Sequence, residues 1–292
     1  MNRHGAVFAL HGAVLLFGFA GLFGKWLDLP PIYIVLGRTI VAAAALAALR
    51  ALRREARPPF DVRLIATGAA LALHWVAFFA AIQVASVAIG LLGYASFPLF
   101  VLVLERVVLG QRWGGREVAT AALVLTGLLL VVPDYSWADR TMQGLAWGLL
   151  SGLTFALLAV LNRRFAAARP ATDVALWQNA YGALALLPFA FATSSIPAFD
   201  ARQIGLILAL GVLCTAVAHT LFIAALRTVR AHTASVVAAL EPVYGIALAF
   251  VLLGEVPGMR TLAGGALIVG AALFATRRAG RGSVEPDAQR RM

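Results

Sequence analysis

Long apolar runs alternate with short polar connections from one end of the chain to the other. Ten such runs can be recognised, at about residues 5–24, 32–50, 64–82, 86–107, 116–133, 143–161, 174–193, 204–226, 232–253 and 261–276. A helix needs about 20 apolar residues to cross the hydrocarbon core of a bilayer. Unpaired backbone groups are not tolerated in lipid, and the runs lack the alternation of a β-barrel. The pattern therefore predicts an all-α membrane protein with ten transmembrane helices.

Composition and charge favour a membrane protein over a nucleic-acid-binding one. Of the 292 residues, 62% are hydrophobic and 13% are charged, whereas soluble domains carry about 25% charged residues. The net charge of +11 resides mainly in the short connections and the C-terminal tail. With the N-terminus inside, nineteen Lys and Arg residues fall on the inner side and four on the outer side. This asymmetry predicts that both termini are cytoplasmic.

The second half of the chain repeats the first. A shift of 144 residues superposes Phe78 on Phe222 and Pro98 on Pro242. Five spans per repeat is an odd number, so the second repeat is predicted to enter the membrane upside down relative to the first. Inverted repeats of this kind place a substrate site near the midplane, between the two halves. The predicted organisation is a first five-helix repeat at 1–135, a second, inverted five-helix repeat at 136–276 and a polar cytoplasmic tail at 277–292.

Two motifs at equivalent places in the repeats carry a family resemblance. They are Glu241-Pro242-Val243 followed by Gly254-Glu255, and Phe97-Pro98-Leu99-Phe100 followed by Gly110-Gln111. With the ten spans and the 5+5 repeat, they resemble the EamA-type exporters of the drug/metabolite transporter superfamily. Within that group the chain is most similar to bacterial exporters of aromatic amino acids. A glutamate is more usual in the family at Gln111, which puts in doubt any role that needs an acid at both loop positions.

The resemblance implies a multi-pass secondary transporter of the bacterial inner (plasma) membrane. Such a protein would export small metabolites, here expected to be aromatic or large neutral amino acids, by alternating access between the repeats. Its partners would be a small-molecule substrate and the lipid bilayer, without a cofactor, a nucleic acid or an implied oligomer. The sequence has no GxxxxGK[ST] run for ATP. The alternatives are a general drug/metabolite exporter with a different substrate and a channel. An enzyme is not expected, because the short loops lack clustered acids, histidines and cysteines.

The adjacent residues Glu241 and Pro242 are the strongest local signal of a site. An acid within a membrane span is costly unless it faces a cavity or a partner, so it indicates a functional position. The alternative is a structural contact with Arg38, with Lys25 or with backbone groups freed by the proline. Because Pro98 and Pro242 occupy equivalent repeat positions, both are predicted to be hinges or kinks that line a cavity.

Aromatic residues and histidines supply the remaining candidates for substrate binding. Such rings stack on flat substrates and attract ammonium groups, and a histidine can bind a carboxylate. Ordinary packing and neutral core histidines are the alternatives. No metal site is predicted, because no second ligand stands at helical spacing beside either span histidine. The candidates besides Glu241 are His74, Trp75, Phe78, Phe79, Tyr94, His219 and Tyr244.

A stripe of small residues marks the sixth span. Gly144, Gly148 and Gly152 recur every four residues and therefore lie on one face of a helix. Such a face allows two helix backbones to approach closely. We interpret the stripe as a packing surface and not as part of the substrate site.

Overall fold

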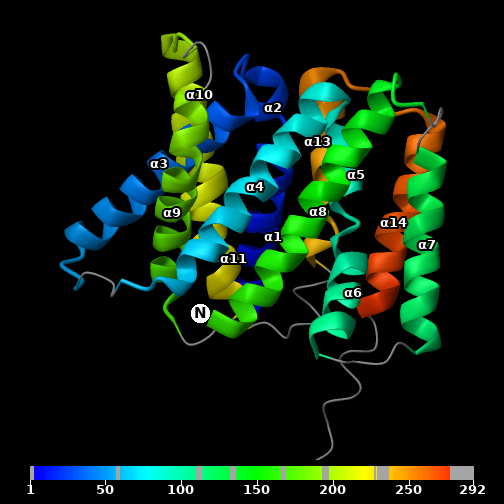
Figure 1. Ribbon diagram of the computed structural model, residues 1–292, viewed down its shortest axis with the longest axis horizontal. Coiled ribbons are helices and arrows are strands. Elements are labelled where there is room, and N and C mark those ends of the chain that lie inside the picture. Colours follow the sequence, from blue (N-terminus) through cyan, green and yellow to red (C-terminus); the bar gives the residue numbers. More distant parts are fainter. Residues whose placement is uncertain are drawn as a thin grey trace, which may run out of the picture.

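A computed structural model of the chain describes residues 3–56, 60–109, 114–131, 136–165, 169–192, 197–226, 228 and 237–276. Every regular element within these ranges is helical (Figure 1). The first repeat contains α1 (Arg3–Ala20), α2 (Phe23–Trp26), α3 (Pro31–Leu52), α4 (Arg63–Val84), α5 (Val87–Tyr94), α6 (Phe97–Leu109) and α7 (Gly115–Val131). The second contains α8 (Arg140–Phe165), α9 (Ala171–Phe191), α10 (Ala201–Gly211), the π-helix η1 (Val212–Val217), α11 (Ala218–Leu226), α13 (Glu241–Leu253) and α14 (Met259–Thr276).

Among the described residues, seven helical stretches are long and apolar enough to cross a membrane. They are His4–Trp26, Pro31–Leu52, Arg63–Val84, Val87–Leu104, Arg140–Asn162, Ala171–Phe191 and Ala201–Phe222. Three shorter apolar helices, Val118–Val131, Glu241–Leu253 and Met259–Phe274, fall on the other three predicted runs. An all-α membrane protein with ten helices is thus confirmed, although three of the helices are shorter than a full span. The predicted tail at 277–292 and the Gly110-Gln111 pair lie outside the described residues.

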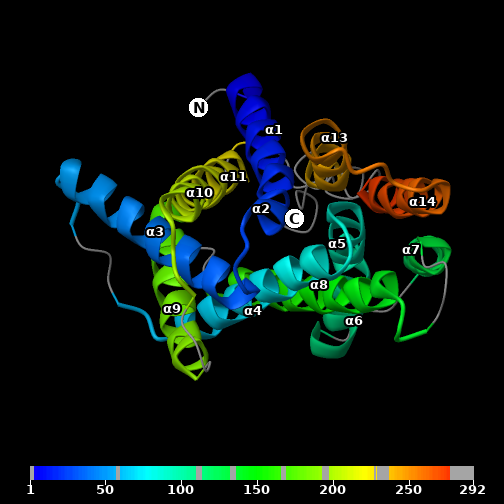
Figure 2. The same ribbon diagram turned by 90° about the horizontal axis from the view of Figure 1, so that it is seen from above.

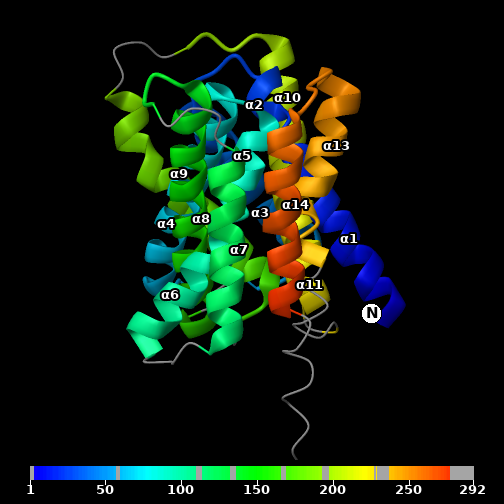
Figure 3. The ribbon, with the colours of Figure 1, turned by 90° about the vertical axis from the view of Figure 1, so that its right-hand side faces the viewer.

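The helix contacts come in equivalent sets. Helix α7 packs on α14, and α3 on α9, so each of these pairs joins one repeat to the other. Helix α4 of the first repeat packs on α8, and the equivalent contact of the second repeat is that of α11 with α1. Likewise, α5 packs on α8, and the equivalent contact is that of α13 with α1. Seen from above, α3 and α9 lie at one side and α7 and α14 at the other (Figure 2). Figure 3 shows α7 and α14 side by side.

The first span of the first repeat and the first span of the second repeat run in opposite directions. Lys25, at the end of α2, donates a hydrogen bond to the Ala85 carbonyl, and Arg140, at the start of α8, donates one to the Val84 carbonyl. The end of the first span and the beginning of the sixth therefore lie at the same end of the bundle (Figure 1). This arrangement is consistent with inverted repeats.

Glycines allow the two repeats to approach closely. A Cβ atom added to Gly148 of α8 would lie 2.8 Å from the Cα of Gly93 in α5, and one added to Gly18 of α1 would lie 2.8 Å from the backbone nitrogen of Gly245 in α13. Real Cβ atoms do not come this close, so larger residues would push the helices apart. The rest of the α8 stripe faces the same neighbours, since Gly144 abuts Ala85 and Gly152 abuts Ser96.

Both predicted hinge prolines lie in the first turn of a helix and not in its middle. Pro98 is the second residue of α6, after a break at Ala95–Ser96, and Pro242 is the second residue of α13. A proline is tolerated in a first helical turn because its missing N–H would have no intrahelical partner there. The two spans are thus interrupted at the equivalent positions that the repeat indicates, but each interruption is a new helix start and not a bend within a continuous helix.

Candidate functional site

A small cavity of about 30 Å³ lies among helices of both repeats. We call it the central cavity. Helices α1, α3, α4 and α5 of the first repeat and α13 of the second contribute its walls. The residues that line it are Phe17, Ala20, Arg38, His74, Trp75, Phe78, Tyr94 and Glu241. A cationic side chain, a carboxylate and several rings therefore meet in one buried space.

Arg38 is held in place by the π-helix opposite it. Its Nε donates a hydrogen bond of 3.0 Å to the Thr215 hydroxyl, and Nη2 donates one of 3.5 Å to the Cys214 carbonyl. The Thr215 hydroxyl in turn donates to the Leu210 carbonyl at 2.9 Å. The guanidinium carbon lies 3.9 Å from the centre of the Trp75 ring, close enough for a cation–π interaction. The side chain is only 2% exposed, so its position is fixed from several sides.

The bonds to η1 leave part of the guanidinium available. An arginine carries five N–H donors, and two of them are engaged within the part of the chain that the structure describes. Because Arg38 lines the central cavity, the other donors can bind an anionic or carbonyl group there. Arginine suits this task, since its planar donors match the geometry of a carboxylate.

Glu241 is the first residue of α13 and is 8% exposed. Its carboxylate makes no hydrogen bond or ion pair with any of the described residues. The sequence allowed a structural contact with Arg38 or Lys25, but the ion pairs among these residues include neither, and Lys25 instead donates to Ala85. A carboxylate in a first helical turn is favoured by the N–H groups and the dipole of the helix. Glu241 therefore lines the cavity at a helix start, without an ionic partner among the described residues.

His74 fixes the aromatic wall to the second repeat. Its Nδ1 lies 3.0 Å from the backbone oxygen of Ser151 and 2.9 Å from the Ser151 hydroxyl, both on α8. Its ring centre is 5.3 Å from that of Tyr94 and 5.0 Å from that of Phe155. The wall made by α4 and α5 is thus tied to α8 through one histidine.

Three of the predicted substrate-binding residues are not part of the lining of the central cavity. Phe79 is fully buried in the core beside Phe23, because it lies about 100° around α4 from Phe78. His219 packs against Trp75 at 5.4 Å between ring centres. Tyr244 is hydrogen-bonded through its hydroxyl to His11 of α1 at 2.8 Å. The other five predicted residues do line the cavity: His74, Trp75, Phe78, Tyr94 and Glu241.

Arg38 is the main lining residue that the sequence interpretation missed as a binding group. From the sequence it is expected only as a structural partner of Glu241. Yet it is the one charged side chain in the apolar run 32–49, so the argument applied to Glu241 holds for it equally. Phe17 and Ala20 carried no comparable signal, because single apolar residues within a span are ordinary.

Comparison with known proteins identifies the family. Residues 4–132 and 142–277 each match the sequence profile of the EamA-like transporter family. The chain belongs to this family. It is therefore a multi-pass membrane transporter and not an enzyme. The first matched segment corresponds to the helices from α1 to α7, and the second to those from α8 to α14.

Individual relatives agree on transport without agreeing on a substrate. An uncharacterised transporter of Archaeoglobus fulgidus is 30% identical over 200 residues, which is 68% of this chain and 71% of the relative. The pseudopaline exporter CntI of Pseudomonas aeruginosa is 28% identical over 228 residues, 78% of either chain. A solved crystal structure with 24% identity superposes with a TM-score of 0.65 over 93% of this chain and 98% of the other, which shows the shared fold. These relatives support the EamA resemblance, but not the finer one to aromatic amino-acid exporters.

Proposed function

We propose that the protein is a secondary exporter of small amphoteric metabolites, with aromatic or large neutral amino acids as its substrates. The central cavity is the proposed substrate site. The cycle is alternating access, in which one repeat moves against the other.

The observation that carries this proposal is that Arg38 and Glu241 both line one cavity, whose other walls are mainly aromatic rings. Arg38 has free donors for a carboxylate, and Glu241 has no ionic partner among the described residues. An α-amino acid presents a carboxylate and an ammonium group on one carbon atom, and so offers a partner to each. Trp75, Phe78 and Tyr94 offer π-faces to an aromatic or large apolar side chain.

The size of the central cavity bears on the transport cycle. At about 30 Å³ it is far smaller than sites for drug-sized ligands, which occupy roughly 300–1,000 Å³. Substrate binding therefore requires the rings and helices around the cavity to separate. The breaks before α6 and at the start of α13 are the proposed places for this movement, because a helix start can change direction without breaking internal hydrogen bonds.

Counterflow in liposomes tests the proposal. Purified protein is reconstituted, unlabelled L-tryptophan is loaded inside, and uptake of labelled L-tryptophan is measured. Tryptamine lacks the carboxylate and indole-3-propionate lacks the ammonium group, so both serve as matched competitors. We expect saturable uptake, stimulation by internal substrate and much weaker competition by either one-charge analogue. Flux that ignores internal substrate would indicate a channel instead.

The relation to a pseudopaline exporter supports a second candidate. Its name describes outward transport of pseudopaline, and the side chains of Arg38 and Glu241 would suit other amphoteric compounds equally well. Pseudopaline and a lipophilic cation are therefore added as competitors in the same assay. Competition by pseudopaline without any by tryptophan would transfer the proposal to that substrate class, and competition by the cation alone would indicate a general drug exporter.

A further inference from the structure

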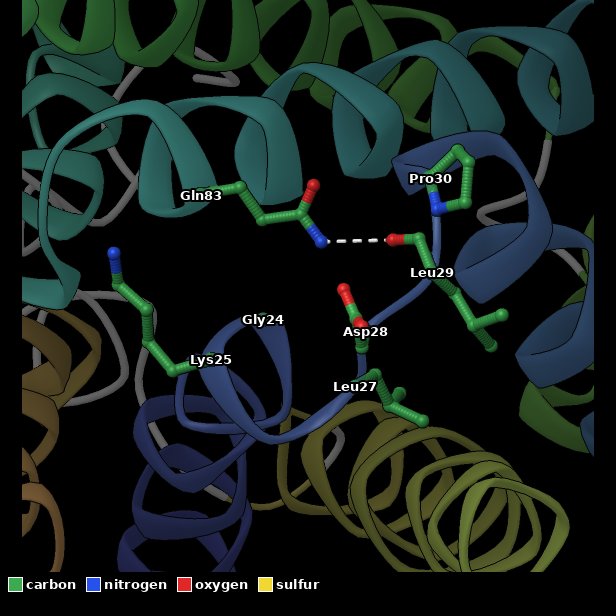
Figure 4. A pocket seen from close by; sticks show the side chains of 7 residues that line it. All are labelled: Gly24, Lys25, Leu27, Asp28, Leu29, Pro30 and Gln83. Atoms are coloured by element: carbon green, nitrogen blue, oxygen red, sulfur yellow. Dashed lines mark hydrogen bonds between the residues drawn. The ribbon is translucent and has the colours of Figure 1, made fainter. Parts of the chain in front are cut away.

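A second and larger hollow lies at the end of the bundle where the first span joins α3 and where α4 joins α5 (Figure 4). We call it the end pocket. Its volume is about 540 Å³, within the range of small-molecule sites. The residues that line it are Gly24, Lys25, Leu27, Asp28, Leu29, Pro30 and Gln83.

The walls of the end pocket are fixed by hydrogen bonds to neighbouring helices. The Gln83 side chain on α4 donates to the Leu29 carbonyl at 2.9 Å, and Gln203 of α10 donates to the Asp28 carbonyl at 3.4 Å. The side chains of Leu27 and Leu29 are buried in the core on the other side of the loop. The loop therefore presents backbone and polar side chains to the pocket, and its shape is largely formed in advance.

Two opposite charges face each other across this pocket. Figure 4 shows Lys25 on one side and Asp28 on the other, with Gln83 between them. The Lys25 ammonium uses one donor for the Ala85 carbonyl at 2.9 Å, which leaves two of its three donors available. Within the part of the chain that is described, the Asp28 carboxylate has no hydrogen-bond or ion-pair partner. The two groups remain apart and can each bind a charge of opposite sign.

The end pocket adjoins the central cavity along the same two segments. The first span contributes Ala20 to the cavity and Gly24 to the pocket, and α4 contributes Phe78 and Gln83. Four to five residues along a helix correspond to about 6–7.5 Å. At the pocket wall, Gly24 packs tightly against the side chains of Phe79 and Ile82 of α4.

We propose that the end pocket is a second binding site for amphoteric molecules, in which Lys25 binds a carboxylate and Asp28 binds an ammonium group. It lies on the route between the central cavity and the solvent at this end of the bundle. The proposal takes its ligand class from the proposed function, whereas the recognition chemistry follows from Lys25 and Asp28 themselves.

Cysteine protection tests the end pocket directly. Cys214 is the single cysteine of the chain, so Cys214→Ala provides a cysteine-free background. Pro30→Cys then places a thiol in the pocket wall, at an exposed position whose carbonyl, and not its ring, caps α3. Val256→Cys is the control, because Val256 is 78% exposed and is not part of the pocket lining. The purified protein in detergent is labelled with a bulky maleimide, with and without L-tryptophan, at constant ionic strength.

We expect L-tryptophan to slow the labelling of Pro30→Cys but not that of Val256→Cys. Tryptamine and indole-3-propionate should protect less well. Because both charges are exposed to solvent, Asp28→Asn and Lys25→Met should each raise the half-protecting concentration by up to about fivefold. Equal protection by the one-charge analogues, or equal protection in the two variants, would overturn the proposal.

A central-site variant separates this proposal from the proposed function. In Arg38→Met, protection of Pro30→Cys should persist although transport is lost, and Glu241→Gln replaces that variant if it does not purify as a single species. Loss of protection in the folded variant would mean that binding at the central cavity causes it, which would overturn the end-pocket site. Protection without tryptophan transport in the unmutated protein would overturn the proposed function alone. Transport without protection would overturn only the end-pocket site.

Discussion

The central cavity and the end pocket each contain one basic and one acidic side chain, but the surroundings of the two pairs differ. Arg38 and Glu241 are buried among rings in a space of about 30 Å³. Lys25 and Asp28 are exposed at the edge of a hollow of about 540 Å³. The first pair faces a ligand only after the surrounding helices separate, whereas the second pair is reachable from solvent.

This difference determines what each space can contribute. Charges in a low-dielectric interior interact strongly with a ligand, and they strongly disfavour a ligand that leaves one of them unpaired. Exposed charges are weakened by water and salt. We therefore expect the central cavity to select the substrate and the end pocket to hold it briefly. Four predictions test this division, beginning with the largest expected effect.

Removal of the buried cation should have the largest effect. In Arg38→Met, tryptophan counterflow should lose about 100-fold in kcat/KM, because a hydrogen-bonded charge is worth about 1.5–3 kcal/mol and each 1.4 kcal/mol is tenfold. Lys25→Met is the matched control at the end pocket, and its kcat/KM for tryptophan should fall by no more than about fivefold. Arg38→Lys should be intermediate, since it keeps the charge without the planar donor geometry.

The comparison between Arg38→Met and Lys25→Met needs a control for folding. Size-exclusion profiles and thermal unfolding establish that both variants are folded before their kinetics are compared. Similar losses in the two folded variants would mean that the central cavity has no special role in selection.

Neutralising the buried acid should change selectivity as well as rate. In Glu241→Gln, tryptophan kcat/KM should fall by about 30-fold, within the range for hydrogen bonds to charged groups. Indole-3-propionate should compete better relative to tryptophan, because its missing ammonium group no longer leaves a carboxylate unpaired. Asp28→Asn is the control and should leave the order of the competitors unchanged. An unchanged order in Glu241→Gln would exclude an ammonium-binding role for this residue.

Much of the fold followed from the sequence because the bilayer limits what an apolar run can be. Runs of about 20 residues can only be helices, and the 144-residue offset placed breaks at Pro98 and Pro242. The form of those breaks did not follow. A proline is compatible both with a kink in a helix and with the first turn of a new one, and only the turn at Ala95–Ser96 distinguishes the two cases for Pro98.

Site residues could be predicted from the sequence where they are charged, because a charged residue is costly within a membrane span. They could not be predicted where they are apolar, because apolar residues are common there. Glu241 stood out for the first reason, and Arg38 could have been found by the same argument. The rings of α4 could not be sorted, since Phe78 and Phe79 are equally apolar and only the rotation of the helix turns one to the cavity and the other to the core. The end pocket gave no signal, because Lys25 and Asp28 resemble ordinary loop charges.

The ring beneath Arg38 should matter less than the charge itself. Trp75→Ala removes the ring that lies 3.9 Å from the guanidinium, and tryptophan kcat/KM should fall by about tenfold, in line with a buried cation–π contact. Trp75→Phe keeps a smaller ring and should recover most of this loss. Phe79→Leu is the comparison, because the Phe79 ring is not part of the cavity lining and lies farther from the guanidinium carbon, at 5.6 Å. A larger loss in Phe79→Leu than in Trp75→Ala would contradict the assignment of the cavity wall.

The smallest effect is expected at a contact that joins the repeats beside the end pocket. The Glu255 carboxylate, in the connection after α13, accepts a hydrogen bond of 3.0 Å from the Val87 backbone nitrogen at the start of α5. Since a side-chain acceptor of this kind stabilises a helix start by about 1 kcal/mol, Glu255→Ala should favour separation of the repeats at this end by about fivefold. Labelling of Ala20→Cys, in the central cavity, measures this in the Cys214→Ala background and should become faster by that factor.

Glu255→Gln is the matched variant, because its amide oxygen can still accept the bond and only the charge is lost. In this variant the labelling of Ala20→Cys should become only about twofold faster, as expected for loss of the interaction between a surface charge and a helix dipole. Slower labelling of Ala20→Cys in Glu255→Ala would show that this contact favours the opened state. It would also mean that the maleimide reaches the central cavity from the opposite end of the bundle and not past the end pocket, which would remove the link between the two spaces.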